Sequence, residues 1–246
     1  MNSDTGTPPR SIRVAIAVAT MLSVVAVVAV LAVIYMTPHS ARERAVVGMG
    51  AGLVLFWCVL GGALQRLWCD RIVSAMRRVP GPAAVGFVVS ASVMALIEEA
   101  VATAMTNAAP IFGATSAEAY ITPSTNWLHT VSLHSVVVFV PMFAVWAWLL
   151  GRRWFFPSEA MLLVGTNGLL TEWLTFGQFN PIWWFVYGLM VWLPARAFAG
   201  ELGAGRPRPG IRIVLLSLVL PLVAAAPVVV VIQALHPKDL ADLSMR

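Results

Sequence analysis

Charged residues in general, and lysine in particular, are scarce in this sequence of 246 residues. Charged side chains make up 11% of the chain, hydrophobic ones 59%, and Lys238 is the only lysine. Soluble globular domains carry roughly 25% charged residues. The composition therefore excludes a soluble globule and predicts an all-α, polytopic membrane bundle. A retinal protein is excluded as well, because its Schiff base needs a lysine within the bundle and Lys238 follows the last hydrophobic stretch.

Cysteine is almost absent too. Cys58 lies within a hydrophobic stretch and Cys69 lies just after it. Disulfides and structural metal sites need cysteines at characteristic spacings in a suitable compartment. These two residues therefore predict neither a disulfide nor a cysteine metal site.

Seven stretches are long enough to cross a membrane, for which roughly 20 apolar residues are needed. Residues 12–235 form a single predicted transmembrane domain between a tail of residues 1–11 and a tail of residues 236–246. The seven expected spans are Ile12–Met36, Ala45–Leu67, Ala83–Ala108, Val131–Leu150, Glu159–Phe176, Pro181–Phe198 and Ile211–Leu235.

The basic residues are distributed unequally between the two sides that these spans define. One side, which includes the N-terminal tail, holds twelve arginines, whereas the other holds Arg42, Arg44, Lys238 and Arg246. An excess of Lys and Arg marks the cytoplasmic side. We therefore expect a multi-pass protein of the cell membrane with its N-terminus inside and its C-terminus outside. The net charge of +5 then reflects anionic lipid headgroups and not a nucleic-acid partner.

Three glutamates lie well inside hydrophobic stretches, where no lysine or arginine accompanies them. Glu98 and Glu99 belong to the third stretch and Glu172 to the fifth. An unpaired carboxylate in hydrocarbon is costly, so such residues usually face the bundle interior and mark a functional site. We expect the three side chains to be at least partly protonated, so that a neutral carboxylic acid among them can act as a proton donor.

The predicted catalytic residues fall in one layer of the membrane. A helical rise of ~1.5 Å per residue places Glu99, Glu172 and His134 about 20–24 Å from the inner ends of their helices. Glu98 points about 100° away from Glu99, which makes Glu99 the expected cavity residue and Glu98 its support. Gly165 and Gly168 precede Glu172 on one helix face and would let a neighbouring helix approach closely.

A short similarity within the chain indicates an internal repeat of residues 77–150 and 152–198. The segment Ala95–Glu99 (ALIEE) aligns with Gly168–Glu172 (GLLTE), and a pair of arginines precedes each. Parallel repeats are a known way to place matching groups at one membrane depth.

Aromatic and small polar residues near the same level are the expected substrate-binding set. Tryptophans at this level also suit an interfacial belt, but their faces can stabilise a cation next to Glu172. The long connection after residue 108 is the length of a lid or binding loop. The set comprises Trp173, Trp127, Tyr120, Trp183, Asn107 and Thr103.

A metal site is the less favoured interpretation of the histidines. His129 and His134 are five residues apart, which separates them on a single helix, where ligands sit three or four apart. His129 could still reach inward from the loop, so His129, His134 and Glu99 remain an alternative metal set.

About half of the chain, residues 77–198, carries a series of residues in a characteristic order: Glu98 or Glu99, Pro110–Gly113, Tyr120–Thr122, Pro141 with Trp146 and Trp148, Glu172 and Pro181. With this series the segment resembles the membrane carotenoid hydratases and the small membrane lycopene cyclases. The resemblance implies acid-initiated addition across a double bond of a long isoprenoid, without a metal or organic cofactor.

Taken together, the residues predict an integral membrane enzyme that hydrates, cyclises or isomerises a hydrophobic isoprenoid-type lipid. Glu99 is the expected proton donor, Glu172 its partner or base, and His134 a hydrogen-bonding modulator. Two alternatives stay open: a CAAX-type intramembrane metalloprotease, although Thr103 stands where that family has arginine, and a proton- or cation-coupled carrier without enzymatic activity.

Overall fold

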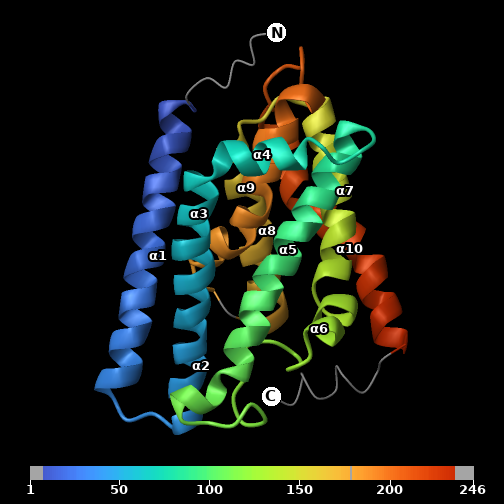
Figure 1. Ribbon diagram of the computed structural model, residues 1–246. Coiled ribbons are helices and arrows are strands. Elements are labelled where there is room, and N and C mark those ends of the chain that lie inside the picture. The colour runs from blue at the N-terminus through green and yellow to red at the C-terminus, as the bar shows by residue number, and fades with distance from the viewer. Residues whose placement is uncertain (1–7, 178, 236–246) are drawn as a thin grey trace.

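The computed structural model describes residues 8–177 and 179–235 as a bundle of helices (Figure 1). No strand occurs among these residues, which confirms the all-α prediction. The outer tail of residues 236–246 and most of the N-terminal tail lie outside the described residues. The helices are α1 (Arg10–Met36), α2 (Ala41–Leu53), η1 (Val54–Gly61), α3 (Gly62–Leu67), α4 (Cys69–Met76), α5 (Ala83–Asn107), η2 (Ala109–Phe112), α6 (Trp127–Leu133), α7 (Val136–Arg152), α8 (Pro157–Phe176), α9 (Trp183–Leu202) and α10 (Ile211–Leu235).

Four helices of the described chain are long and apolar enough to cross a membrane, and a bent pair, α6 with α7, makes a fifth. The four are Arg10–Met36, Ala41–Leu67, Ala83–Asn107 and Ile211–Ile232, which lie where the first, second, third and seventh spans were predicted. Helices α8 and α9 also form at their predicted places, with 20 residues each. That these two cross the membrane stays a prediction.

The fourth predicted span, Val131–Leu150, is broken. Helices α6 and α7 are bent by 46° relative to each other. The amides of His134 and Ser135 both donate to Thr130 O, at 2.9 and 3.1 Å, which ends α6. Ser135 has the non-helical angles φ −127° and ψ −82°, and its carbonyl accepts from Val138 N at the start of α7. Hydropathy runs on through this break, which is why the sequence predicted one helix.

Helices α2, η1 and α3 form one helical rod in which η1 is a π-helix. The wider turns of a π-helix interrupt the regular ladder and are frequent at functional sites. Within η1, Trp57 is buried and donates from Nε1 to Val186 O of α9 at 2.9 Å. This bond fixes the rod against the helix that carries part of the site.

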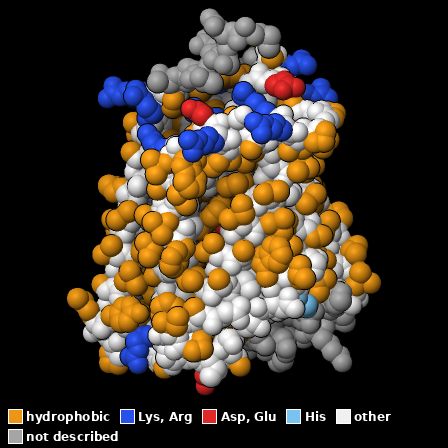
Figure 2. Space-filling model, viewed as in Figure 1, with side chains coloured by type: hydrophobic (Ala, Val, Ile, Leu, Met, Phe, Trp, Pro, Cys, Tyr) orange, Lys and Arg blue, Asp and Glu red, His pale blue; other side chains and the backbone are white. Residues whose placement is uncertain are grey.

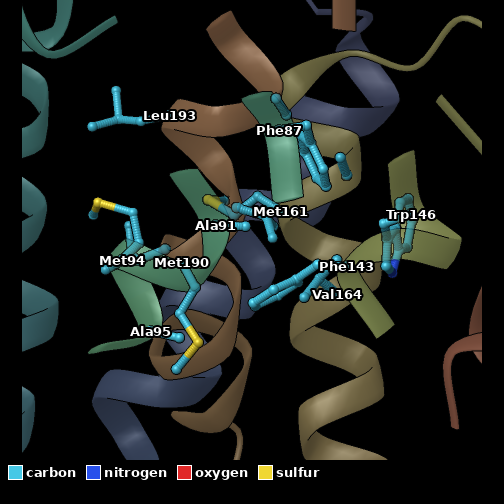
Figure 3. Packing of buried hydrophobic residues seen from close by; sticks show 14 of the residues in the cluster. Phe87, Ala91, Met94, Ala95, Phe143, Trp146, Met161, Val164, Met190 and Leu193 are labelled. Carbon is cyan, nitrogen blue, oxygen red and sulfur yellow. The ribbon is translucent and has the colours of Figure 1, made fainter. Parts of the chain in front are cut away.

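The centre of the bundle is formed by α5, α7, α8 and α9. Figure 3 shows Phe87 and Met94 of α5 packed with Phe143 of α7, Val164 of α8 and Met190 of α9. Lipid tails are as apolar as these side chains, so helix association in a membrane depends on close packing and on hydrogen bonds between helices.

Two glycines confirm the predicted close approach to the Glu172 helix. A Cβ atom at Gly165 would lie 2.2 Å from Trp184 O, and one at Gly168 would lie 2.0 Å from Cδ2 of Tyr187. Helices α8 and α9 therefore meet backbone to backbone, and this contact brings Tyr187 towards Glu172.

Positive charge gathers at one end of the molecule. Figure 2 shows most of the visible Lys and Arg side chains at the end where α1 begins, above a broad hydrophobic surface. Helix α10 ends at the opposite end of the bundle from the start of α1 (Figure 1). The positively charged end corresponds to the arginine-rich side expected from the sequence. The start of α1 and the end of α10 would lie at opposite ends if the chain crosses the membrane an odd number of times.

Candidate functional site: a buried carboxyl cluster

The three glutamates of the hydrophobic stretches meet between α5 and α8. Glu98 and Glu99 are each 6% exposed, and Glu172 is half-buried. The Glu98 carboxyl interacts electrostatically with the carboxyls of both Glu99 and Glu172. The structure therefore brings together the acidic residues that the sequence singled out, with Glu98 in the central position and not at the margin.

Tyr187 of α9 completes this carboxyl cluster (Glu98, Glu99, Glu172 and Tyr187). Its hydroxyl donates a short hydrogen bond to Glu172 Oε1, and it also interacts electrostatically with Glu98 and Glu99. The ring is held by Phe139, at a centroid distance of 5.7 Å, and by Trp183, at 5.8 Å.

Sequence reasoning missed Tyr187. It ends the aromatic run Trp183–Tyr187, which was attributed to substrate binding and to an interfacial belt. The signal that could have found it is its hydroxyl, the one ionisable group among the predominantly apolar residues 181–195.

Three buried oxygens lie together on one side of the Glu99 carboxyl: Oε1 of Glu99, Oγ1 of Thr103 and Oγ of Ser135. The hydroxyls of Thr103 and Ser135 lie beside its carboxyl and interact with it. Within the described chain, however, no hydrogen bond of normal geometry reaches Glu99 Oε1, Thr103 Oγ1 or Ser135 Oγ. All three residues are at least nine-tenths buried. Buried polar atoms without partners are costly, so one small polar molecule such as water would satisfy these three oxygens.

The two histidines lie closer together than their spacing predicted. Their rings have centroids 5.4 Å apart, because the helix ends before His134 and the chain turns there. His134 directly precedes Ser135, whose hydroxyl lies beside the Glu99 carboxyl. The described residues contain no group of three or more His, Cys, Asp or Glu side chains that could hold a metal ion.

Three of the predicted substrate-binding residues lie close to the carboxyl cluster or contact one of its helices. Thr103 is next to Glu99, and Trp183 packs on Tyr187. Trp127 is half-buried and donates from Nε1 to Leu96 O of α5 at 3.4 Å.

The other three predicted substrate-binding residues are placed differently. Trp173 is 51% exposed and packs edge-on against Phe179, although its neighbour Glu172 points inward. Asn107 is exposed and donates to Thr103 O and Thr125 O, at 3.0 and 2.9 Å. Tyr120 is half-buried in the connection between η2 and α6. Asn107 thus ties this connection to α5.

Thr106 anchors the same connection a second time. Its Oγ1 accepts from Ile121 N, Thr122 N and Thr122 Oγ1, at 3.2, 3.0 and 2.8 Å. The segment predicted as a lid is therefore fixed to the end of α5.

A small apolar cavity adjoins the cluster at Tyr187. It measures about 20 Å³ and is lined by Phe139, Phe143, Trp146 and Thr171 among others. A volume of this size holds one or two waters and no part of a long lipid.

The carboxyl cluster, the three buried oxygens beside Glu99 and the small cavity at Tyr187 are the features of the described residues that bear on function. No family model, no curated protein and no solved structure matches the chain.

Proposed function

We propose that this protein is a seven-span enzyme of the cell membrane, with its N-terminus inside and its C-terminus outside, that acts on a hydrophobic lipid of the isoprenoid type. Its buried carboxylic acids would start a hydration, a cyclisation or an isomerisation. The observation that carries the proposal is the meeting of three carboxyls and one phenol with no arginine or lysine of the described chain paired to them.

The chemistry follows from that composition. Carboxyls without a cation in an apolar bundle hold protons, and a positioned acid can transfer its proton to an alkene carbon. Glu99 gives its proton to the double bond, and the carbocation so formed takes up water or loses a proton from a neighbouring carbon. Glu172, hydrogen-bonded to Tyr187, accepts the proton released, and His134 adjusts the polarity beside Glu99.

Two features of the surroundings support this role. The oxygens of Thr103 and Ser135 next to Glu99 suit a bound water. The rings of Phe139 and Trp183, which pack on Tyr187 next to Glu172, suit a developing positive charge, because ring faces attract cations. Exclusion of bulk water protects such an intermediate.

Comparison of membrane lipids tests the proposal. The wild type and the variants Glu99→Gln and Glu172→Gln are produced in a host that accumulates long isoprenoids, and the extracted lipids are compared by mass and retention. We expect a product in the wild type, with a mass gain of one water for hydration or an unchanged mass for rearrangement. Each variant should lower its yield by about 10²–10⁴-fold.

The exposed Glu201 of α9 supplies the matched control, because Glu201→Gln removes the same charge away from the cluster. Equal yields from wild type, Glu99→Gln and Glu172→Gln would contradict acid catalysis by this cluster.

A carrier is the second candidate, and the size of the cavity favours it. A space of about 20 Å³ beside Tyr187 admits water or a proton relay more readily than a lipid. Chains of ionisable groups within the membrane carry protons in pumps and transporters. Proton flux into vesicles that disappears in Glu99→Gln, with no change in lipid composition, would support the carrier over the enzyme.

A further inference from the structure

We propose that the groove between α7 and α10 binds one anionic glycerophospholipid, with an acyl chain in the groove and the phosphate on Arg152. This site lies apart from the carboxyl cluster and does not depend on the function proposed for it.

The groove is open and apolar. It has a volume of about 410 Å³ and is lined only by apolar side chains: Ala144, Val145 and Trp148 of α7, and Leu220, Val223 and Ala224 of α10. Trp148 is 47% exposed and Val223 is 59% exposed, so the groove faces outward. Only 17% of the most apolar stretch of α10 is buried. In a membrane-spanning bundle such a channel is in contact with acyl chains.

A positively charged side chain, that of Arg152, lies at the end of this groove. The guanidinium of Arg152 lies over the Trp148 ring, 5.4 Å from its centroid. Trp148 itself lines the groove, so the cation is held one helical turn above the apolar channel. Arg153 is the next residue, and Arg212 is the second residue of α10, on the other side of the groove.

No carboxylate of the described chain forms an ion pair with Arg152. The ion pair found there joins Arg208 to Glu159 at 2.9 Å, and that arginine also covers Trp154 and Phe156. Arg152 is exposed and makes its cation–π contact alone. Phosphate oxygens form strong charge-assisted bonds with guanidinium groups.

The charge of Arg152 and the apolar groove beside it together indicate which molecule binds there. Basic pockets between transmembrane helices bind anionic lipid headgroups, and the arginine-rich end at which Arg152 lies is the end expected to face the cytoplasm. A second apolar helix would use the channel without using Arg152, and in a zwitterionic lipid the choline cation would offset the charge of the phosphate at Arg152. An anionic lipid uses both.

Native mass spectrometry of the purified chain in neutral detergent tests the site, with an equimolar mixture of phosphatidylglycerol and phosphatidylcholine as the probe. We expect the wild type to retain phosphatidylglycerol in preference. Arg152→Gln should reduce that preference about fivefold, the value of one basic residue near a lipid surface. Ala144→Phe, which fills the exposed groove, should reduce retention of both lipids.

Two control variants separate this site from general effects. Arg42→Gln removes an exposed arginine at the opposite end, and Ala63→Phe adds the same bulk to another exposed helix face. Both should leave lipid retention unchanged. Equal retention of the two lipids by the wild type, an unchanged preference in Arg152→Gln, or a lipid-free dimer that Ala144→Phe disrupts would each overturn the proposal.

Discussion

At the scale of single residues, the site is defined by the hydrogen bond between Tyr187 and Glu172 and not by the carboxyls alone. A phenol that donates to a carboxylate oxygen orients it and leaves its second oxygen to accept another proton. Glu98 lies near enough to Glu99 and Glu172 to interact with both. We therefore expect the cluster to share its protons as one group, so that a charge placed on it belongs to the whole set.

Removal of the Tyr187 hydroxyl tests this interpretation. Tyr187→Phe keeps the ring that packs on Phe139 and Trp183 but removes the donor to Glu172. A hydrogen bond to a charged or polarised group contributes about 1.5–3 kcal/mol. We expect turnover or proton flux to fall about tenfold to a hundredfold, and the infrared C=O band of the Glu172 carboxyl to shift.

The exposed Tyr35 of α1 supplies the control, since Tyr35→Phe makes the same chemical change at the lipid-facing surface. An unchanged carboxyl band in a folded Tyr187→Phe protein would show that this hydroxyl does not serve the cluster.

The acidic residues could be predicted from the sequence because their cost in hydrocarbon is a property of each residue and its neighbours in the chain. Ser135 could not, and Tyr187 offered only its hydroxyl within an apolar stretch, with no sign of its partner Glu172. Their roles depend on which helices pack together, and the α8–α9 contact and the break before α7 are tertiary features. Trp173 shows the same limit, because it adjoins Glu172 in sequence but points to the surface.

At the scale of helices, the contact between α8 and α9 positions the site. Gly165 lies against the backbone of Trp184 and Gly168 against the ring of Tyr187. The missing side chains let the two helices approach until Tyr187 reaches Glu172. Small residues serve this purpose widely in membrane bundles.

Gly168→Ala should separate these helices. Its Cβ atom would lie 2.0 Å from the Tyr187 ring, and overpacking of this kind costs about 1–3 kcal/mol. We expect a lower midpoint of thermal unfolding in detergent, together with loss of the Tyr187–Glu172 hydrogen bond. Gly151→Ala on α7 is the matched control, because nothing lies within 4 Å of its Cβ position.

Hydropathy over a whole span also does not reveal two irregular elements of the backbone. Val54–Gly61 is as apolar as any regular helix, yet it forms a π-helix whose Trp57 bonds to α9. The break at His134–Ser135 is a short polar interruption between apolar residues on either side. Hydropathy reports which residues enter a membrane but not how the backbone bonds within it, so the helices could be located while these two irregularities could not.

At the scale of the whole molecule, the separation of charge along the bundle makes orientation testable. Cys69 begins α4 at the arginine-rich end, after the second candidate span, and Cys58 lies within that span. With Cys58→Ala, Cys69 is the single thiol of the chain. Burial raises the pKa of the Cys69 thiol, so less of it is thiolate at neutral pH and its reaction with maleimides should accelerate as the pH rises.

A membrane-impermeant maleimide applied at alkaline pH should therefore label Cys69 in inverted vesicles and leave it unlabelled in intact cells, because the arginine-rich end is expected to face the cytoplasm. The reverse pattern is expected for a cysteine-free chain that carries Ala117→Cys, since Ala117 is exposed in the connection between η2 and α6, beyond the opposite end of α5. Labelling of both positions from the same side would require α5 to begin and end on one face of the membrane. Such a result would remove the carboxyl cluster from the hydrocarbon, and the reason for these acids to hold protons would disappear with it.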